Sequence, residues 1–109
     1  MEDIFSIKQL SEQVGINGDT ILYYEKIGIL PKIERNNRGH RVYESKHKTR
    51  LDLIICLKKA GMSLEEIKKY LKLTISERNQ MLLEHKKKLE EQMKEIQRII
   101  EIKLKSTQN

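Results

Sequence analysis

The sequence has few of the features that mark secreted, membrane-spanning or disulfide-stabilised proteins. Its 109 residues include one cysteine, one proline and no tryptophan, and a single cysteine excludes an internal disulfide framework. No apolar run reaches the roughly 20 residues that cross a bilayer as a helix. The opening stretch MEDIFSIKQL lacks the basic and apolar regions of a signal peptide. These absences predict a cytoplasmic protein without a membrane partner.

Basic residues outnumber acidic ones, and the excess is local. The chain has 22 Lys and Arg against 16 Asp and Glu, a net charge of +6. Residues 32–50 alone hold seven basic residues and two acidic ones. Such a concentration favours a polyanionic partner. A chain of this size buries only about 60% of its unfolded surface, so a second copy or a ligand is expected to complete it.

Two short helices are predicted near the N-terminus. The first covers residues 6–15, with Ser6 as its N-cap and Gly15 as its stop. The second covers residues 17–28 and is capped by Asn17. Two helices joined by so tight a turn form a helix-turn-helix, whose second helix can enter the major groove of DNA.

The second helix carries two adjacent tyrosines, Tyr23 and Tyr24. Neighbours on a helix diverge by about 100°, so at most one of the two rings can point into a core. The other can meet a polar surface such as a phosphate backbone. The alternative is a ring that lies along the protein's own surface.

A basic hairpin is predicted over residues 30–43, LPKIERNNRGHRVY. The only proline ends the preceding helix, and Asn-Asn-Arg-Gly supplies residues that tolerate a tight β-turn. Arg35, Arg38 and Arg41 are expected to project from the hairpin, with Tyr43 at its base. Beside a helix-turn-helix this is a wing that grips phosphates. The alternative is a solvated surface hairpin.

A helix pair follows, over residues 44–60 and 62–73. In the second helix, Ser63 and Glu66 form a capping box. In the first helix, Lys58 and Lys59 precede an Ala-Gly turn, where a second basic corner can touch DNA. The apolar stripe expected on the first helix consists of Leu53, Cys56, Leu57 and Ala60.

Residues 76–105 are predicted to form one long helix, because they contain no glycine or proline and are rich in charged residues. Lys86 and Lys103 interrupt an apolar heptad seam along it. At about 45 Å such a helix is too long to be covered by the preceding domain, so the seam predicts a second chain. The alternative is a helix folded back on its own domain. The seam consists of Leu82, Leu89, Met93, Ile96 and Ile100.

The order of these parts resembles the MerR family of bacterial transcription regulators. TILYYEKIGILP is similar to the family's Thr-x-x-Tyr-Tyr-Glu recognition helix, RNNRGHRVY to its Arg-x-x-x-Gly-x-Arg-x-Tyr wing, and AGMSLEEIKKYL to its Gly-x-Ser-Leu-x-Glu-Ile segment. The resemblance implies a mainly α fold. A winged helix-turn-helix DNA-binding domain with a small β-hairpin wing covers 1–75, and a dimerisation helix, expected to form an antiparallel coiled coil, covers 76–109.

The resemblance also implies partners and contacts. The partners are double-stranded promoter DNA, a second copy of the chain, and RNA polymerase at promoters with a long spacer, which the regulator bends and untwists. No cofactor is expected. The residues expected to bind DNA are Asp19, Thr20, Tyr23, Tyr24, Lys26, Arg35, Arg38, Gly39, Arg41, Tyr43 and Lys58.

The sequence departs from the family pattern in two places. Leu22 stands where the family usually has Arg, so a phosphate or base contact is missing, and either the affinity is lower or the operator differs. No drug-binding domain is expected after the long helix. Metal sensing is not expected either, because residues 57–109 lack cysteine and the histidines are scattered.

Cys56 allows two interpretations. Its place before the Gly-x-Ser segment resembles the subgroup that answers to aldehydes or other thiol-reactive electrophiles. Its place on the apolar stripe instead favours a small core hydrophobe, because a reactive thiol needs access and a lowered pKa.

One alternative function and one excluded class concern the whole chain. A protein-interaction module would use the long helix to recruit a different, acidic partner. An enzyme is not expected, because no nucleophile, base and orienting residue are grouped in the sequence.

Overall fold

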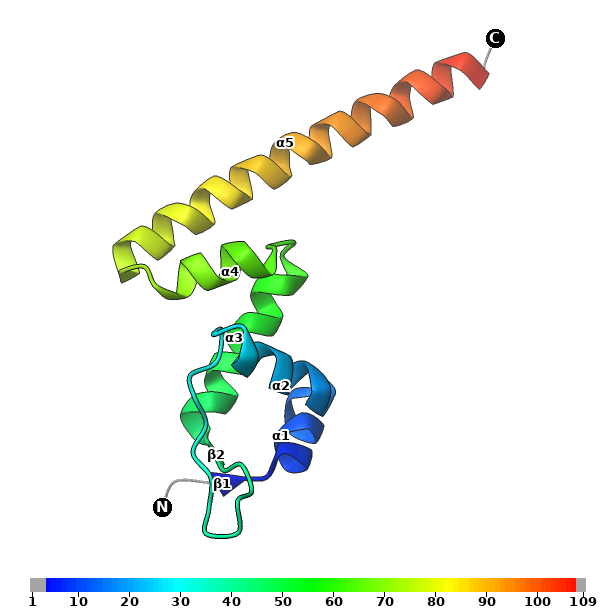
Figure 1. The fold of residues 1–109 in the computed structure, drawn as a ribbon. Helices are drawn as coiled ribbons and strands as arrows, with labels where there is room; N and C mark the ends of the chain where they lie inside the picture. Colours follow the sequence, from blue (N-terminus) through cyan, green and yellow to red (C-terminus); the bar gives the residue numbers. More distant parts are fainter. Residues whose placement is uncertain (1–3, 108–109) are drawn as a thin grey trace. The chain divides into compact units, whose positions relative to one another are not determined.

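The computed structural model describes residues 4–107, which form a mainly helical chain with a small antiparallel sheet and a long C-terminal helix (Figure 1). The predicted fold class is confirmed. The chain divides into two compact units, Met1–Leu71 and Lys72–Asn109. The elements are β1 (Ile4–Phe5), α1 (Ile7–Val14), α2 (Gly18–Lys26), β2 (Tyr43–Glu44), α3 (Ser45–Lys59), α4 (Leu64–Leu71) and α5 (Ile75–Thr107).

Both helices of the helix-turn-helix begin at the predicted caps and α1 ends at the predicted Gly15, but α2 ends at Lys26, before the predicted Gly28. The Ser6 hydroxyl accepts the Gln9 N–H at 3.2 Å, and the Gln9 side chain accepts the Ser6 N–H at 2.8 Å. Gly15 ends α1 in the left-handed conformation at φ +77°, which glycine adopts without a Cβ clash. The Asn17 side chain accepts the Asp19 N–H at 2.8 Å and so caps α2. These caps fix the turn between the two helices.

The core of the first unit is formed by α1, α2, α3 and α4 together with the base of the wing (Figure 1). α1 contributes Leu10, and α2, α3 and α4 each contribute buried residues at helical spacing. Seven of the fully buried side chains are Leu10, Ile21, Ile29, Leu51, Ile54, Met62 and Ile67.

The apolar stripe predicted for α3 is confirmed at Leu57 and wrong at its other three positions. The buried side chains of α3 are His47, Leu51, Ile54 and Leu57. Leu53 is only partly buried, and Cys56 and Ala60 are exposed. Near its middle, α3 has apolar residues on more than one side, so two different stripes at helical spacing fit the sequence. Packing against α1 and α4 decides which stripe is buried.

The short sheet contains a strand that was not predicted. Ile4 pairs with Glu44 and Phe5 with Tyr43 in antiparallel register. Two residues are too few to show an alternating pattern, so no sequence signal marked β1. The strand buries Phe5 and covers the base of the wing.

His47 makes folding stability depend on pH. Its ring is buried, its Nδ1 accepts the Glu44 N–H at 2.9 Å, and burial lowers its pKa below the ordinary 6.5, with the nearby Glu44 carboxylate opposing this in part. The unfolded chain therefore takes up a proton on His47 before the folded protein does. We expect the free energy of unfolding to fall as the pH is lowered from about 7 through 6.5.

The control for this prediction is His47→Gln, whose side-chain oxygen can accept the same N–H but does not titrate. Denaturant unfolding of both proteins between pH 5 and 8 measures the difference. Equal pH dependence in the two proteins would assign the acid sensitivity to other groups.

α5 is a single helix of 33 residues, about 50 Å long. Thr74 caps it, because the Thr74 hydroxyl accepts the Glu77 N–H at 3.2 Å and the Glu77 carboxylate accepts the Thr74 N–H at 3.0 Å. Hydrogen bonds from the Thr74 backbone and side chain to the Glu77 carboxylate hold its pKa below the usual value. The five predicted seam side chains are 37 to 66% exposed in the single chain.

Within residues 4–107, no helix combines the length and apolar character required to cross a bilayer. The same residues contain no group of three or more His, Cys, Asp or Glu side chains arranged to hold a metal ion.

Candidate nucleic-acid interface

α2 presents one face to the core and the opposite face outward. Ile21 and Tyr24 are buried. The outward face, which we call the outer face of α2, consists of Asp19, Leu22, Tyr23 and Lys26, at the spacings of three and four that place side chains together. Three of the four are exposed, and Leu22 is partly exposed.

The two tyrosines divide as the sequence predicted. Tyr24 is 7% exposed and Tyr23 is 49% exposed, with ring centroids 6.4 Å apart and planes tilted by 47°. Burial raises the pKa of Tyr24. Tyr24 is therefore part of the core, which corrects its assignment as a DNA contact, and Tyr23 is the member of the pair whose ring is open to a partner.

The wing is a tight hairpin closed by backbone bonds and by the Asn36 side chain. Arg35 and Arg41 form its β-bridge. The Asn36 N–H donates to the His40 carbonyl at 2.8 Å, and the Asn36 side-chain oxygen accepts the N–H groups of Arg38 and His40 at 3.0 and 3.1 Å. Next to this turn, Gly39 has φ +79°, a conformation that favours glycine. The turn thus holds the exposed Arg38 side chain at the tip.

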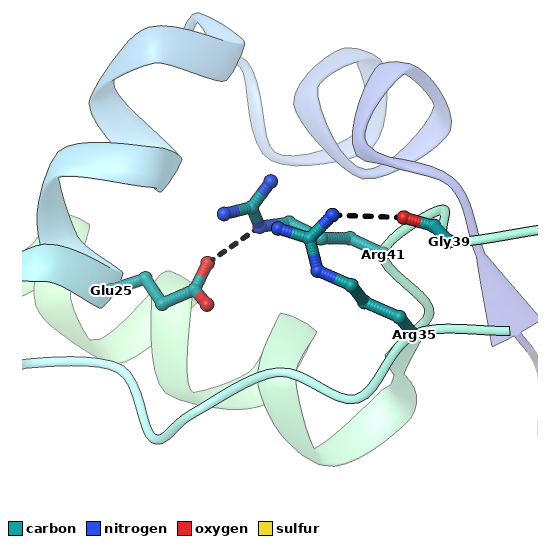
Figure 2. A network of polar contacts seen from close by, with 4 residues as sticks. All are labelled: Glu25, Arg35, Gly39 and Arg41. Atoms are coloured by element: carbon teal, nitrogen blue, oxygen red, sulfur yellow. Dashed lines mark hydrogen bonds and ion pairs between the residues drawn. The ribbon is translucent and has the colours of Figure 1, made fainter.

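Two arginines of the wing form hydrogen bonds with other residues of the same chain (Figure 2). Arg35 reaches across the hairpin and donates from Nη1 to the Gly39 carbonyl at 2.8 Å. Arg41 points toward α2 and donates from Nε to the Glu25 carboxylate at 2.9 Å. The Arg41 and Glu25 side chains are only 31% and 16% exposed. This ion pair ties the wing to the recognition helix.

Sequence reasoning missed Glu25. The sequence offered one indication of its role: Glu25 directly follows the tyrosine pair, one helical turn beyond the buried Ile21, and a basic hairpin comes next in the chain. The pairing could not be read from the chain, because 16 residues separate Glu25 from Arg41. Arg41 therefore positions the wing, whatever its other NH groups contact.

The assignment of Tyr43 as a DNA contact is corrected by its burial. Tyr43 has no exposed surface, and its hydroxyl is buried without a hydrogen-bond partner among the described residues. Burial raises the pKa of Tyr43, and the Glu25 carboxylate raises it further. Tyr43 anchors the base of the wing in the core, with the His47 ring edge-on at 6.1 Å.

Most of the other predicted DNA contacts lie on the surface. Thr20 is partly exposed. The exposed ones are Asp19, Lys26, Arg35, Arg38, Gly39 and Lys58. The end of the Lys68 side chain, from α4, lies beside Gly28 just after α2, about 3.7 Å from where a Cβ on that glycine would be. There it complements the negative end of the helix dipole.

Cys56 is exposed. The interpretation of Cys56 as a buried core residue is therefore corrected. The reason is the same as for the α3 stripe, because α3 packs against the core with the side that carries Leu51 and Ile54. The thiol is accessible in the single chain.

Comparison with known proteins identifies the class to which these features belong. The family model described as MerR HTH family regulatory protein matches residues 5–74, and the model described as MerR, DNA binding matches residues 48–102. The chain belongs to the MerR family of DNA-binding helix-turn-helix transcription regulators, which are not enzymes.

Individual relatives support this assignment. The chain is 39% identical over 67 residues to the mercuric resistance operon regulatory protein of Bacillus cereus, covering 62% of this chain and 51% of that protein. It is 30% identical over 115 residues to the uncharacterized HTH-type transcriptional regulator YyaN of Bacillus subtilis, covering 89% and 83%. The chain thus spans about half the length of the first relative.

A solved structure is similar to most of the chain. It is that of HiNmlR, a MerR family regulator lacking the sensor domain, bound to promoter DNA. The TM-score is 0.71 at 30% identity, over 91% of this chain and 80% of HiNmlR.

Proposed function

We propose that this protein is a homodimeric, sequence-specific regulator of promoter DNA. The observation that carries the proposal is the single surface formed by the outer face of α2 and the basic wing, joined by the Arg41–Glu25 ion pair at 2.9 Å. In each copy, α2 enters the major groove and the wing holds the flanking phosphates. The promoter DNA bound by HiNmlR supports this choice of ligand.

The second copy binds along α5. The seam side chains are exposed over several turns, which is unusual for a chain that acts alone. Two helices paired on this seam present two DNA-binding units, and so match a near-palindromic operator with one half-site for each unit. The antiparallel pairing implied by the family resemblance is part of the proposal.

DNA deformation is the proposed route to regulation. By resemblance to the family, the dimer bends and untwists a promoter with a long spacer so that RNA polymerase can engage. The cost of deformation depends on the sequence deformed, so the central base pairs contribute to specificity without being touched.

The test of the DNA proposal uses the tip of the wing. Arg38 is exposed, and its guanidinium has no hydrogen bond or ion pair within residues 4–107. If it neutralises one phosphate in each half-site, Arg38→Ala reduces the slope of log K against log salt by about 1.8, at about 0.9 for each contact. The loss of affinity is expected to be similar on specific and random DNA.

The matched control is Arg38→Lys, which keeps the charge and is expected to keep the salt slope. The operator comes from genome-wide mapping of bound DNA, and fluorescence anisotropy across a salt series measures the slope. An unchanged slope for Arg38→Ala would remove the wing tip from the interface. Asp19, Thr20, Tyr23, Lys26, Arg35, Gly39 and Lys58 remain proposed contacts, to be ranked by the same measurement.

A response to thiol-reactive electrophiles is the second part of the proposal. It is favoured by the exposed thiol of Cys56 and by two exposed lysines, Lys58 and Lys59, that follow it on α3. We expect formaldehyde, methylglyoxal or a quinone to add to Cys56 in the folded protein, and transcription from the bound promoter to change.

Intact-protein mass spectrometry locates the adduct, with Cys56→Ser as the control. The serine variant is expected to keep operator affinity and lose the response. If it responds to each electrophile as the wild type does, or if the wild-type thiol stays unmodified, the signal does not act through Cys56.

A further inference from the structure

Leu22 is an apolar side chain in the middle of the surface that faces DNA. It lies on the outer face of α2, between the exposed Asp19 one turn before and the exposed Lys26 one turn after. The two residues that precede and follow it, Ile21 and Tyr23, point to the core and outward respectively. Unlike its polar neighbours, Leu22 offers a partner neither a donor nor an acceptor.

The surroundings of Leu22 leave it accessible. It borders a hollow of about 350 Å³ between α2 and the wing, which Ile7, Arg35 and Arg41 also line. It also borders a hollow of about 430 Å³ whose lining includes Lys26 and Arg41. Leu22 is therefore partly exposed and lines both hollows.

The charges that line the two hollows do not oppose the approach of DNA; the acidic Asp19 lies outside both linings. Glu25 lines one of the two hollows, and its carboxylate is already paired with Arg41 at 2.9 Å. The other charged groups that line the two hollows are basic. A nucleic acid can therefore bring a base edge to Leu22, and the interaction there must be a van der Waals contact.

Among the base edges of the major groove, only thymine carries an apolar group, the C5 methyl. We propose that Leu22 is a specificity-determining residue that binds the C5 methyl of one thymine in each half-site. The inference rests on the proposed DNA-binding function and deepens it, because it names the chemical group recognised at this position.

The experiment replaces each operator thymine in turn by deoxyuridine, which removes only the methyl. One position in each half-site is expected to weaken wild-type binding by about fourfold, the value of one buried methyl group. With Leu22→Ala, which removes the side chain that makes the contact, the same replacement is expected to change affinity by less than twofold. Replacing the methyl in both half-sites should multiply the wild-type loss.

Two controls keep the result specific. Glu12→Ala, at an exposed position of α1 that is not a proposed contact, is expected to retain the full methyl effect, and thermal unfolding of Leu22→Ala checks that the helix is intact. The inference is overturned if no position distinguishes wild type from Leu22→Ala, or if both lose affinity equally. A wild-type protein that binds no double-stranded DNA would overturn the proposed function itself, a separate outcome.

Discussion

Ile96→Glu is expected to separate the dimer into single chains. Ile96 lies in the middle of the proposed seam and is 59% exposed in the single chain, so a partner helix is what would bury it. A carboxylate there would be buried without a partner, which costs several kcal/mol for each copy. Sedimentation velocity at micromolar concentration measures the change in mass.

Operator affinity should fall when the dimer is lost, because a single chain binds only one half-site. We expect a loss of about 100-fold or more, since one DNA-binding unit no longer brings the second into position. The matched control is Lys94→Glu, which changes charge at an exposed position away from the seam and should leave the dimer intact.

Two outcomes would count against this account. A dimeric Ile96→Glu protein would move the interface elsewhere. A monomeric wild type at micromolar concentration would contradict both the dimer and the two-half-site operator, and would favour the alternative in which α5 recruits a different, acidic partner.

The direction of the helix pair has its own test in Leu82→Cys, made in a Cys56→Ser background. In an antiparallel pair the two copies of position 82 lie toward opposite ends of the seam, so no disulfide is expected between them. In a parallel pair in register they face each other, and oxidation would link the chains.

Glu25→Ala is expected to lower affinity for the operator while affinity for random DNA rises, so that specificity falls. The change releases Arg41, so the wing loses its tie to α2 and must be ordered when the operator binds. A charge-assisted hydrogen bond contributes about 1.5 to 3 kcal/mol, the lower end applying because Arg41 is partly exposed. In a dimer the two ties together correspond to about a 100-fold loss on the operator.

Random DNA should respond in the opposite direction. Removing a carboxylate beside the phosphates and freeing a cation strengthens the non-specific, electrostatic component of binding. The ratio of specific to random affinity at constant salt is therefore the quantity to measure. Glu25→Gln, which keeps an acceptor for Arg41 without the charge, should lie between the variant and the wild type.

A double-mutant cycle separates positioning from charge. If the ion pair acts as a tie, Arg41→Ala in the Glu25→Ala background adds little further loss on the operator. Independent, additive losses would mean that Arg41 contacts DNA directly and that its bond to Glu25 is incidental.

Many features of this fold could be predicted from the sequence because their signals are local. The capping residues Ser6, Asn17 and Ser63 act on N–H groups two or three positions away, and the structure contains each of these bonds. The seam of α5 repeats every seven residues, so its period is visible without knowledge of the partner. The burial of only one ring of the tyrosine pair follows from the helical angle alone.

What the tertiary structure decided involves residues that lie far apart in the chain. Packing against α1 and α4 chose which apolar face of α3 turns inward, and so placed Cys56 outside and His47 inside. Pairing between β1 and β2 joins the chain's first described residues to the base of the wing and buries Tyr43. The Arg41–Glu25 tie likewise exists only once the hairpin has folded against α2. The sequence by itself determined the helices, the wing, their order and the apolar seam of α5, because these depend on neighbours within about one helical turn or one heptad. Which side chains of those surfaces meet depends on the balance of packing over the whole core, and only the folded chain specifies it.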